Sequence, residues 1–175
     1  IVYAAGFSHE DDRHVQAADF HAFSKPAVFV ADASNADVAG IPRKEREHRL
    51  VEHALRALRA GGNVVIPCDA SGRVLELLLL LERAWASRRL GYPIVLLSPV
   101  AEYTLSYARR MLNWMHKAVL DAFTTTRANP FDAVRHRVTV ATDPAQINHL
   151  DGPMVVLVTP ADLSGGFSAR LLAEW

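Results

Sequence analysis

The sequence is poor in the features that define several large protein classes. It holds one cysteine, Cys68, which excludes an internal disulfide framework and suits a reducing compartment. Fully apolar runs stay short, as in Leu77–Leu81, and none is long enough to span a bilayer. Neither sign of charge dominates, because 19 Lys and Arg residues balance 19 Asp and Glu residues. Bulk charge therefore does not favour a nucleic-acid partner, although a local basic patch can still bind one.

Several well-known motifs are also missing. The chain has neither G-x-G-x-x-G nor a P-loop, which weakens the case for a dinucleotide-dependent enzyme. It has no G-x-S-x-G elbow of the kind that hydrolases use. The chain starts at Ile1 within an expected strand and stops at Trp175 within an expected helix, so we expect it to be a piece of a longer protein.

The most informative local pattern in the sequence is a strand–turn–helix segment, Asn63–Trp85. Asn63–Pro67 carries three β-branched apolar residues in a row, which is typical of a buried strand. Cys68–Arg73 is a short polar turn, and Val74–Trp85 is apolar on almost every side, which predicts a buried helix. The turn lies at the carboxyl end of the strand, where open α/β sheets usually place their sites.

Strand-like and helix-like segments alternate along the chain. The expected strands are Ile1–Ala5, Ala27–Ala31, Asn63–Pro67, Pro93–Ser98, Val134–Ala141 and Met154–Thr159. The expected helices are Arg43–Ala60, Val74–Trp85, Val100–Phe123, Asp143–Leu150 and Ser168–Trp175. This alternation predicts an α/β fold with a mainly parallel sheet and helices on both faces. The composition changes near Gly40–Pro42, which predicts a boundary between domains 1–40 and 41–175.

The segment from His9 to His14, HEDDRH, has a composition that suits zinc. Neighbouring residues of one loop seldom converge on one ion, however, so a charged and solvated connector is the favoured interpretation. His116, His136 and His149 are isolated along the chain and are interpreted as structural or exposed.

Two turns that precede expected helices are candidate anion sites. They are Ser71-Gly72-Arg73 and Ser164-Gly165-Gly166. Exposed amides at the start of a helix can hold an anion, and Arg73 can add a bidentate phosphate contact. The favoured alternative is tight strand-to-helix geometry with Arg73 paired to a carboxylate such as Asp69. From chemistry alone, the sequence thus indicates an α/β domain that can bind anions.

Specific segments then resemble a known family. IPCDASGRVLELLLLLERAW, ANPF (Ala128–Phe131) and VVLVTPADLSGGFSARLLAEW resemble the β-CASP region of metallo-β-lactamase-fold RNA-processing nucleases. Within this family the chain is similar to the larger, catalytically degenerate type of subunit in the cleavage and polyadenylation specificity factor. The features behind this similarity are Asn35-Ala36, Asp69 with Val74-Leu75-Glu76-Leu77, and Asp162-Leu163 with Gly166-Phe167-Ser168. Asp12-Arg13-His14 is instead similar to the catalytic paralogue.

The resemblance implies a domain layout and a lost metal ligand. Residues 1–40 would be the last strands of a first metallo-β-lactamase portion, and 41–175 a Rossmann-like β-CASP domain that caps the metal cleft. Asp32 falls at the first acidic motif of the family. Active members carry a zinc-bridging aspartate just before the phenylalanine that matches Phe7, but this chain has Gly6 there. Glycine offers no ligand atom, so we expect no catalytic residue and no metal ligand in this chain.

The function that the resemblance implies is a non-catalytic, nuclear subunit of the pre-mRNA 3′-end cleavage and polyadenylation machinery. Its expected partners are a catalytic paralogous endonuclease and other 3′-end processing factors, without cofactor or membrane. Ser71, Gly72 and Arg73 are candidate contacts to pre-mRNA or another anion. One alternative is a zinc-dependent RNA endonuclease of the same fold, in which Asp32 would help to hold a histidine or a proton relay. Another is a nucleotide- or phosphate-binding domain that uses Ser71–Arg73.

Overall fold

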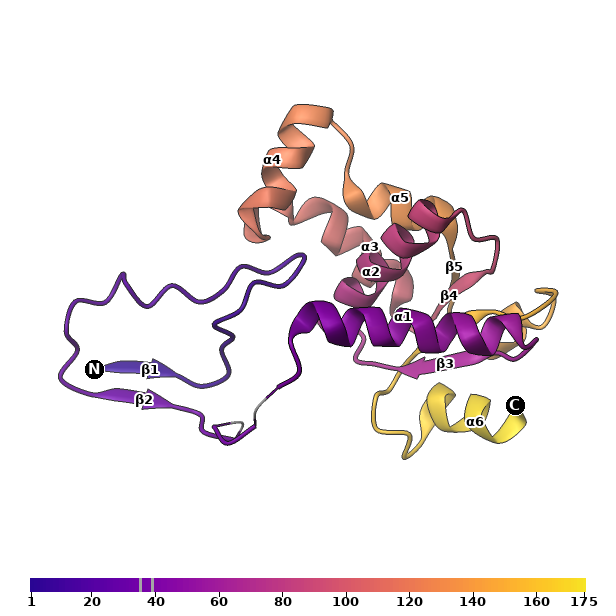
Figure 1. Ribbon diagram of the computed structural model, residues 1–175, viewed down its shortest axis with the longest axis horizontal. Helices are drawn as coiled ribbons and strands as arrows, with labels where there is room; N and C mark the ends of the chain where they lie inside the picture. Colours follow the sequence, from indigo (N-terminus) through magenta and orange to yellow (C-terminus); the bar gives the residue numbers. More distant parts are fainter. Residues whose placement is uncertain (35, 39) are drawn as a thin grey trace.

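The computed structural model describes residues 1–34, 36–38 and 40–175, and for 133–136 it describes the backbone alone. Two separate parallel sheets form (Figure 1). The small sheet pairs β1 (Val2–Ala4) with β2 (Phe29–Ala31). The large sheet has the order β3-β6-β4-β5, formed by β3 (Val64–Pro67), β6 (Val155–Val158), β4 (Ile94–Leu97) and β5 (Val138–Ala141). The predicted parallel α/β architecture is confirmed.

Helices cover both faces of the large sheet, as the alternating pattern predicts (Figure 1). One face packs against α1 (Arg43–Arg59), α2 (Arg73–Arg88), α3 (Ala101–Arg110) and α5 (Pro130–Arg137). The other face packs against the short 3-10 helix η2 (Pro144–Ile147) and α6 (Gly166–Glu174). Successive strand residues point to opposite faces, so Ile94 and Leu96 join the first core while Val95 and Leu97 join the second. Both faces of the sheet are therefore buried.

Helix α2 is the most deeply buried helix of the first layer. Its apolar side chains Val74, Leu78 and Leu81 are fully inaccessible to solvent, and each contributes roughly 2 kcal/mol through burial. Gly72 directly precedes the helix with φ of +58°, a left-handed conformation that favours glycine and allows the tight turn from β3. One carboxylate, Glu76, is buried within this apolar helix.

The expected long helix over Val100–Phe123 is wrong. The chain instead forms α3, the 3-10 helix η1 (Leu112–Trp114) and α4 (Lys117–Thr126). The break follows from contacts that are distant in sequence: the His116 backbone N–H donates to the His14 carbonyl at 2.8 Å. The His116 ring Nδ1 then accepts from the Ala118 N–H at 2.9 Å and caps α4.

The expected strand over Val134–Ala141 begins too early, because α5 continues to Arg137 and β5 starts at Val138. The Asn129 side chain accepts a hydrogen bond from the Phe131 N–H at 3.0 Å, and Pro130 occupies the first helical position. Phe131 is fully buried and anchors this helix in the core. The side chain of His136 lies outside the described residues.

The N-terminal part is a two-stranded ribbon with a long connection between its strands (Figure 1). Phe20 packs edge-to-face on Phe7 and Phe29, with ring centroids 4.8 and 5.4 Å apart. Asn35 of the predicted Asn35-Ala36 feature lies outside the described residues, and the boundary between 40 and 41 stays a prediction. Within the described part of the chain, no helix is both long and apolar enough to cross a membrane.

Candidate functional site

Gly6 and Asp32 lie at the same edge of the small sheet. Ala4 pairs with Ala31 in the parallel register; Asp32 follows directly after β2, and Gly6 lies two residues after the end of β1. Gly6 has φ of +68°, and a Cβ placed on it meets no atom within 4 Å. The position is open but supplies no ligand atom.

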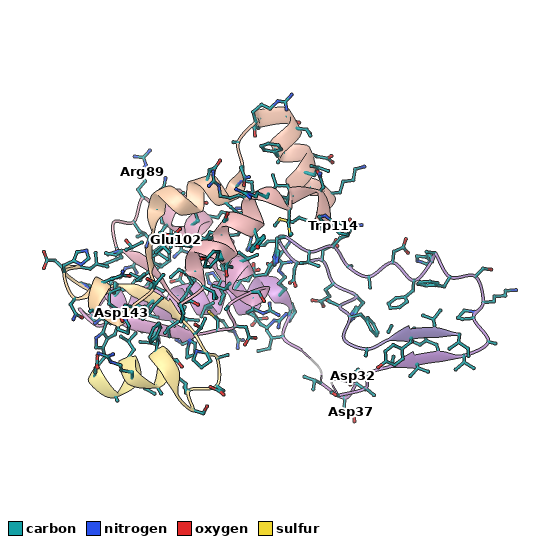
Figure 2. All side chains as sticks on the ribbon, turned by 180° about the vertical axis from the view of Figure 1, so that it is seen from behind. Asp32, Asp37, Arg89, Glu102, Trp114 and Asp143 are labelled. Atoms are coloured by element: carbon teal, nitrogen blue, oxygen red, sulfur yellow. The ribbon has the colours of Figure 1, made fainter. Side chains whose placement is uncertain are left out.

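The Asp32 carboxylate is engaged in its own turn. It accepts hydrogen bonds from the Ser34 N–H at 2.8 Å and from the Ser34 hydroxyl. These bonds lower the pKa of Asp32 and keep the exposed carboxylate ionised. Figure 2 shows Asp32 near the link between the ribbon and the large sheet. Its role as the first acidic motif of the family stays a prediction.

The residues present do not fit the two-zinc centre of active family members. Among the described side chains, which leave out residues 35, 39 and 133–136, no three from His, Cys, Asp or Glu gather closely enough to hold a metal ion. Gly6 leaves the bridging position without a carboxylate. The described side chains from His9 to His14 belong to no such group either.

That connector has a specific structural role instead. It reaches back from the small sheet toward the helices of the large one (Figure 1). At α2 both oxygens of Glu76 accept hydrogen bonds from it. The backbone N–H groups of Arg13 and His14 each donate at 2.8 Å. The His14 ring Nδ1 also lies against Glu76 Oε1, where it donates to the carboxylate. His14 is itself buried, so this contact is shielded from solvent.

Two further side chains complete an ion network, defined here as Arg13, His14, Arg43, Glu47 and Glu76. Arg43 donates to Glu47 at 2.8 Å and lies 3.5 Å from Glu76. Arg13 pairs with the same Glu47 at 2.5 Å. Burial alone would raise the pKa of Glu76, but the hydrogen bonds from His14 and Arg13 outweigh it and lower the pKa to about 2. The network joins the connector, α1 and α2.

His116 extends this junction to the start of α4. Its backbone N–H donates to His14, and its ring Nε2 lies 3.5 Å from a carboxylate oxygen of Asp11. The connector therefore contacts the break between α3 and α4 as well as α1 and α2. These contacts attach the connector, and through it the small sheet, to the helices on one face of the large sheet.

The Ser71–Arg73 turn lies at the carboxyl end of β3 and is exposed throughout. The Thr104 hydroxyl donates to the Ala70 carbonyl at 2.8 Å and holds the turn against α3. Arg73 lines a hollow of about 140 Å³ whose other charged residues are of both signs: Arg43, Arg46, Asp12, Glu47 and Glu76. Among the described residues, Arg73 forms no ion pair, so the expected partner Asp69 does not neutralise it. The turn as an anion or RNA contact stays a prediction.

The second candidate turn has a packing explanation. Gly166 has φ of +66°, and a Cβ there would lie 2.8 Å from Pro160 Cδ. Asp162 accepts hydrogen bonds from both the backbone and the hydroxyl of Ser164, which shapes the turn locally. Tight geometry therefore accounts for this glycine.

Cys68 has the environment of an inert thiol. It is buried at the end of β3, and burial with the nearby charge of Asp69 raises its pKa to about 11. The thiol stays protonated at neutral pH and is a poor nucleophile.

Sequence reasoning missed the partnership between Glu76 and His14. A carboxylate flanked by apolar residues near the start of the helix, Glu76 in Val74-Leu75-Glu76-Leu77, was the available signal, because such a charge is seldom buried without a partner. The identity of the partner was not visible, since His14 is 62 positions away.

The fold and the junction define a parallel α/β domain whose helices hold the connector of an N-terminal two-stranded ribbon. A family model, the Beta-Casp domain, matches residues 74–175. The whole chain is 35% identical to "Cleavage and polyadenylation specificity factor subunit 2" of Arabidopsis thaliana, over 24% of that protein. It is 33% identical, over 99% of the chain, to "Cleavage factor two protein 2" of Schizosaccharomyces pombe, covering 23% of it.

A further relative is "Cleavage and polyadenylation specificity factor subunit 3-I" of Arabidopsis thaliana. It is 30% identical over the whole chain, which covers 25% of that protein. The chain thus spans about a quarter of the length of these relatives. The chain belongs to the β-CASP domain family, and the predicted resemblance is confirmed.

Proposed function

We propose that this chain is part of a non-catalytic subunit of the machinery that cleaves and polyadenylates pre-mRNA 3′ ends. The observation that carries the proposal is the match along the whole chain to proteins named as subunit 2 of the cleavage and polyadenylation specificity factor. The relative named as subunit 3-I also matches the whole chain, but at lower identity. This ordering supports the subunit 2 type.

The proposed role is that of a structural partner. The subunit assembles in the nucleus with a catalytic paralogous endonuclease and with other 3′-end processing factors. Pre-mRNA passes near the exposed Ser71–Arg73 turn, where the Arg73 guanidinium can contact a phosphate. The absence of an ion-pair partner for Arg73, among the residues described, supports such a contact.

Gly6 supports the non-catalytic part of the proposal. A two-metal centre needs a carboxylate that bridges both ions, and glycine supplies no donor atom. Two polar residues of the connector are committed to other contacts, because His14 binds Glu76 and Arg13 binds Glu47. We propose no cofactor for this subunit.

The test is the zinc content of the purified full-length protein by elemental analysis, together with an RNA cleavage assay. We expect less than stoichiometric zinc and no cleavage. Stoichiometric zinc with cleavage that a chelator abolishes would contradict the proposal and favour the endonuclease alternative. A Gly6→Asp variant has open space for its side chain but places aspartate at φ of +68°, so circular dichroism first checks that it folds. The folded variant then tests whether the missing carboxylate alone prevents metal binding.

A second experiment addresses the partner. The full-length protein, purified by an affinity tag from cell extract, is expected to retain the catalytic paralogue at a ratio near one to one. Its isolation without the paralogue, and without other 3′-end processing factors, would argue against a structural subunit.

A further inference from the structure

Helix α3 has an unusual solvent-facing side. Ala101, Leu105 and Ala108 are buried and define the side that faces the core. The opposite side carries Tyr103 and Tyr107, whose exposed fractions are 68% and 59%. The solvent side of a surface helix normally carries charged or small polar residues. Two exposed rings, four positions apart at its centre, therefore need an explanation.

The same side continues beyond the end of the helix. Met111 is 47% exposed and Trp114, in η1, is 87% exposed. We define the aromatic row as Tyr103, Tyr107, Met111 and Trp114. Figure 2 shows Trp114 on the side of the large domain that faces the N-terminal ribbon. A tryptophan this exposed leaves most of its ring available for a partner.

Two basic residues near the aromatic row, Arg110 and Lys117, lack an acidic partner among the described residues. Arg110 follows Tyr103 by seven positions, so both point to the same side of α3, and Lys117 begins α4, three residues after Trp114. In the described part of the chain neither cation forms an ion pair, whereas the adjacent Arg109 pairs with Asp132 at 2.6 Å. The charged groups on this side are therefore available to an anion.

The row begins beside the turn at the end of β3. Thr104 follows Tyr103 and donates its hydroxyl hydrogen to the Ala70 carbonyl at 2.8 Å, which places α3 against the Ser71–Arg73 turn. The acidic neighbour of the row, Glu102, projects about 100° away from Tyr103 around the helix axis. The turn and the row thus form one exposed surface with arginine at each end.

We propose that the aromatic row, with Arg110 and the Ser71–Arg73 turn, binds single-stranded RNA. Proteins hold single strands by stacking bases on aromatic rings while cations contact the phosphates, and this surface offers both groups. A protein partner would need apolar side chains for the rings but also acidic groups for each unpaired cation, whereas a polyanion satisfies the cations directly. The inference rests on the proposed function, because that function supplies pre-mRNA as the single-stranded RNA.

The test uses the full-length protein and a fluorescein-labelled single-stranded oligouridine, with binding followed by fluorescence anisotropy. Tyr107→Ala and Trp114→Ala are each expected to weaken binding about fivefold or more. Arg110→Ala is expected to reduce the slope of log affinity against log salt by about 0.7. The matched controls are Trp175→Ala after α6 and Arg56→Ala on α1, both exposed and away from α3, which are expected to leave affinity unchanged.

A second readout locates the contact even where other parts of the protein bind RNA. Ultraviolet crosslinking of 4-thiouridine RNA, followed by mass spectrometry, is expected to label Tyr103, Tyr107 or Trp114. Unchanged affinity in all row variants together with no crosslink to these residues would overturn the inference.

A third outcome separates this inference from the proposed function. Variants of the row that keep RNA affinity but lose the partner subunits would show that the row is a protein interface, and would overturn the inference alone. Zinc-dependent cleavage by the parent protein would overturn the proposed function but leave the crosslinking result intact. Loss of RNA affinity with retained partners would support both.

Discussion

His14 meets Glu76 across 62 positions of the sequence and gives this buried carboxylate both its backbone N–H and its ring Nδ1–H. The contact replaces the water that the carboxylate would otherwise need. It also joins a segment that starts in the small sheet to a helix that packs on the large one. The strands of the two sheets, as far as the structure describes them, share no ladder. The attachment therefore depends on side chains and on the connector backbone.

Replacing Glu76, the buried carboxylate of the ion network, is expected to destabilise the protein. Glu76→Gln removes the buried charge that the backbone N–H groups of Arg13 and His14 and the His14 ring face, and it removes one acidic partner of Arg43, which keeps its pair with Glu47. We expect a loss of about 3 kcal/mol in the free energy of unfolding, measured by urea denaturation. Glu45→Gln, at an exposed acidic position on α1, serves as the control and should change stability by less than about 0.5 kcal/mol. Equal effects in both variants would contradict a central role for Glu76.

The same carboxylate predicts a dependence of stability on pH. The pKa of Glu76 is about 2 in the folded protein against an ordinary value of 4.5, because His14 and Arg13 donate to it and Arg43 lies nearby. Its contribution is therefore fully present above about pH 5 and is lost as the pH falls toward 2. The difference in unfolding free energy between parent and Glu76→Gln should shrink across this window. A difference that stays constant from pH 6 to pH 3 would refute the assignment.

Gly166 is expected to tolerate no side chain. Gly166→Ala would force alanine into a left-handed conformation and bring its Cβ within 2.8 Å of Pro160 Cδ. We expect a destabilisation of about 2 kcal/mol, visible as a lower melting temperature. Gly91→Ala is the matched control, since its Cβ meets nothing within 4 Å and its φ is not positive. A neutral Gly166→Ala variant would mean that the turn can relax.

Cys68 is expected to resist modification in the native state. Its burial and its pKa of about 11 leave almost no thiolate at pH 7.5. Iodoacetamide should therefore label Cys68 much faster in 6 M guanidinium chloride than in buffer, as followed by mass spectrometry. Rapid labelling of the folded protein would show that the end of β3 opens to solvent.

The regular part of the fold was predictable from local pattern. Apolar runs such as Ile94–Leu97 and Val155–Val158 indicate strands buried on both faces, and such strands are typically parallel. The break after Arg110 was not predictable, because the carbonyl that draws His116 away belongs to His14. At Val134 the β-branched residue suggested a strand, but the Asn129-Pro130 start signal extends α5 instead.

One part of the candidate site was also predictable from the sequence, and another part was not. The exposed turn at Ser71–Arg73 followed from its place between strand and helix, and the structure puts it at the carboxyl end of β3 as predicted. The solvent-facing side of α3 was hidden in the sequence, because Tyr103 and Tyr107 also suit a buried helix. Only the packing of Leu105 against the core shows which side is free.

The long-range contacts of Glu76 also carry a kinetic consequence. Helix α2 can form early from local contacts, but its carboxylate is left without donors until residues 13 and 14 arrive across a loop of about 60 residues. Closing a loop of this length costs conformational entropy, so the connector is expected to dock after the transition state for folding. Weakening His14 should then accelerate unfolding and leave the folding rate almost unchanged.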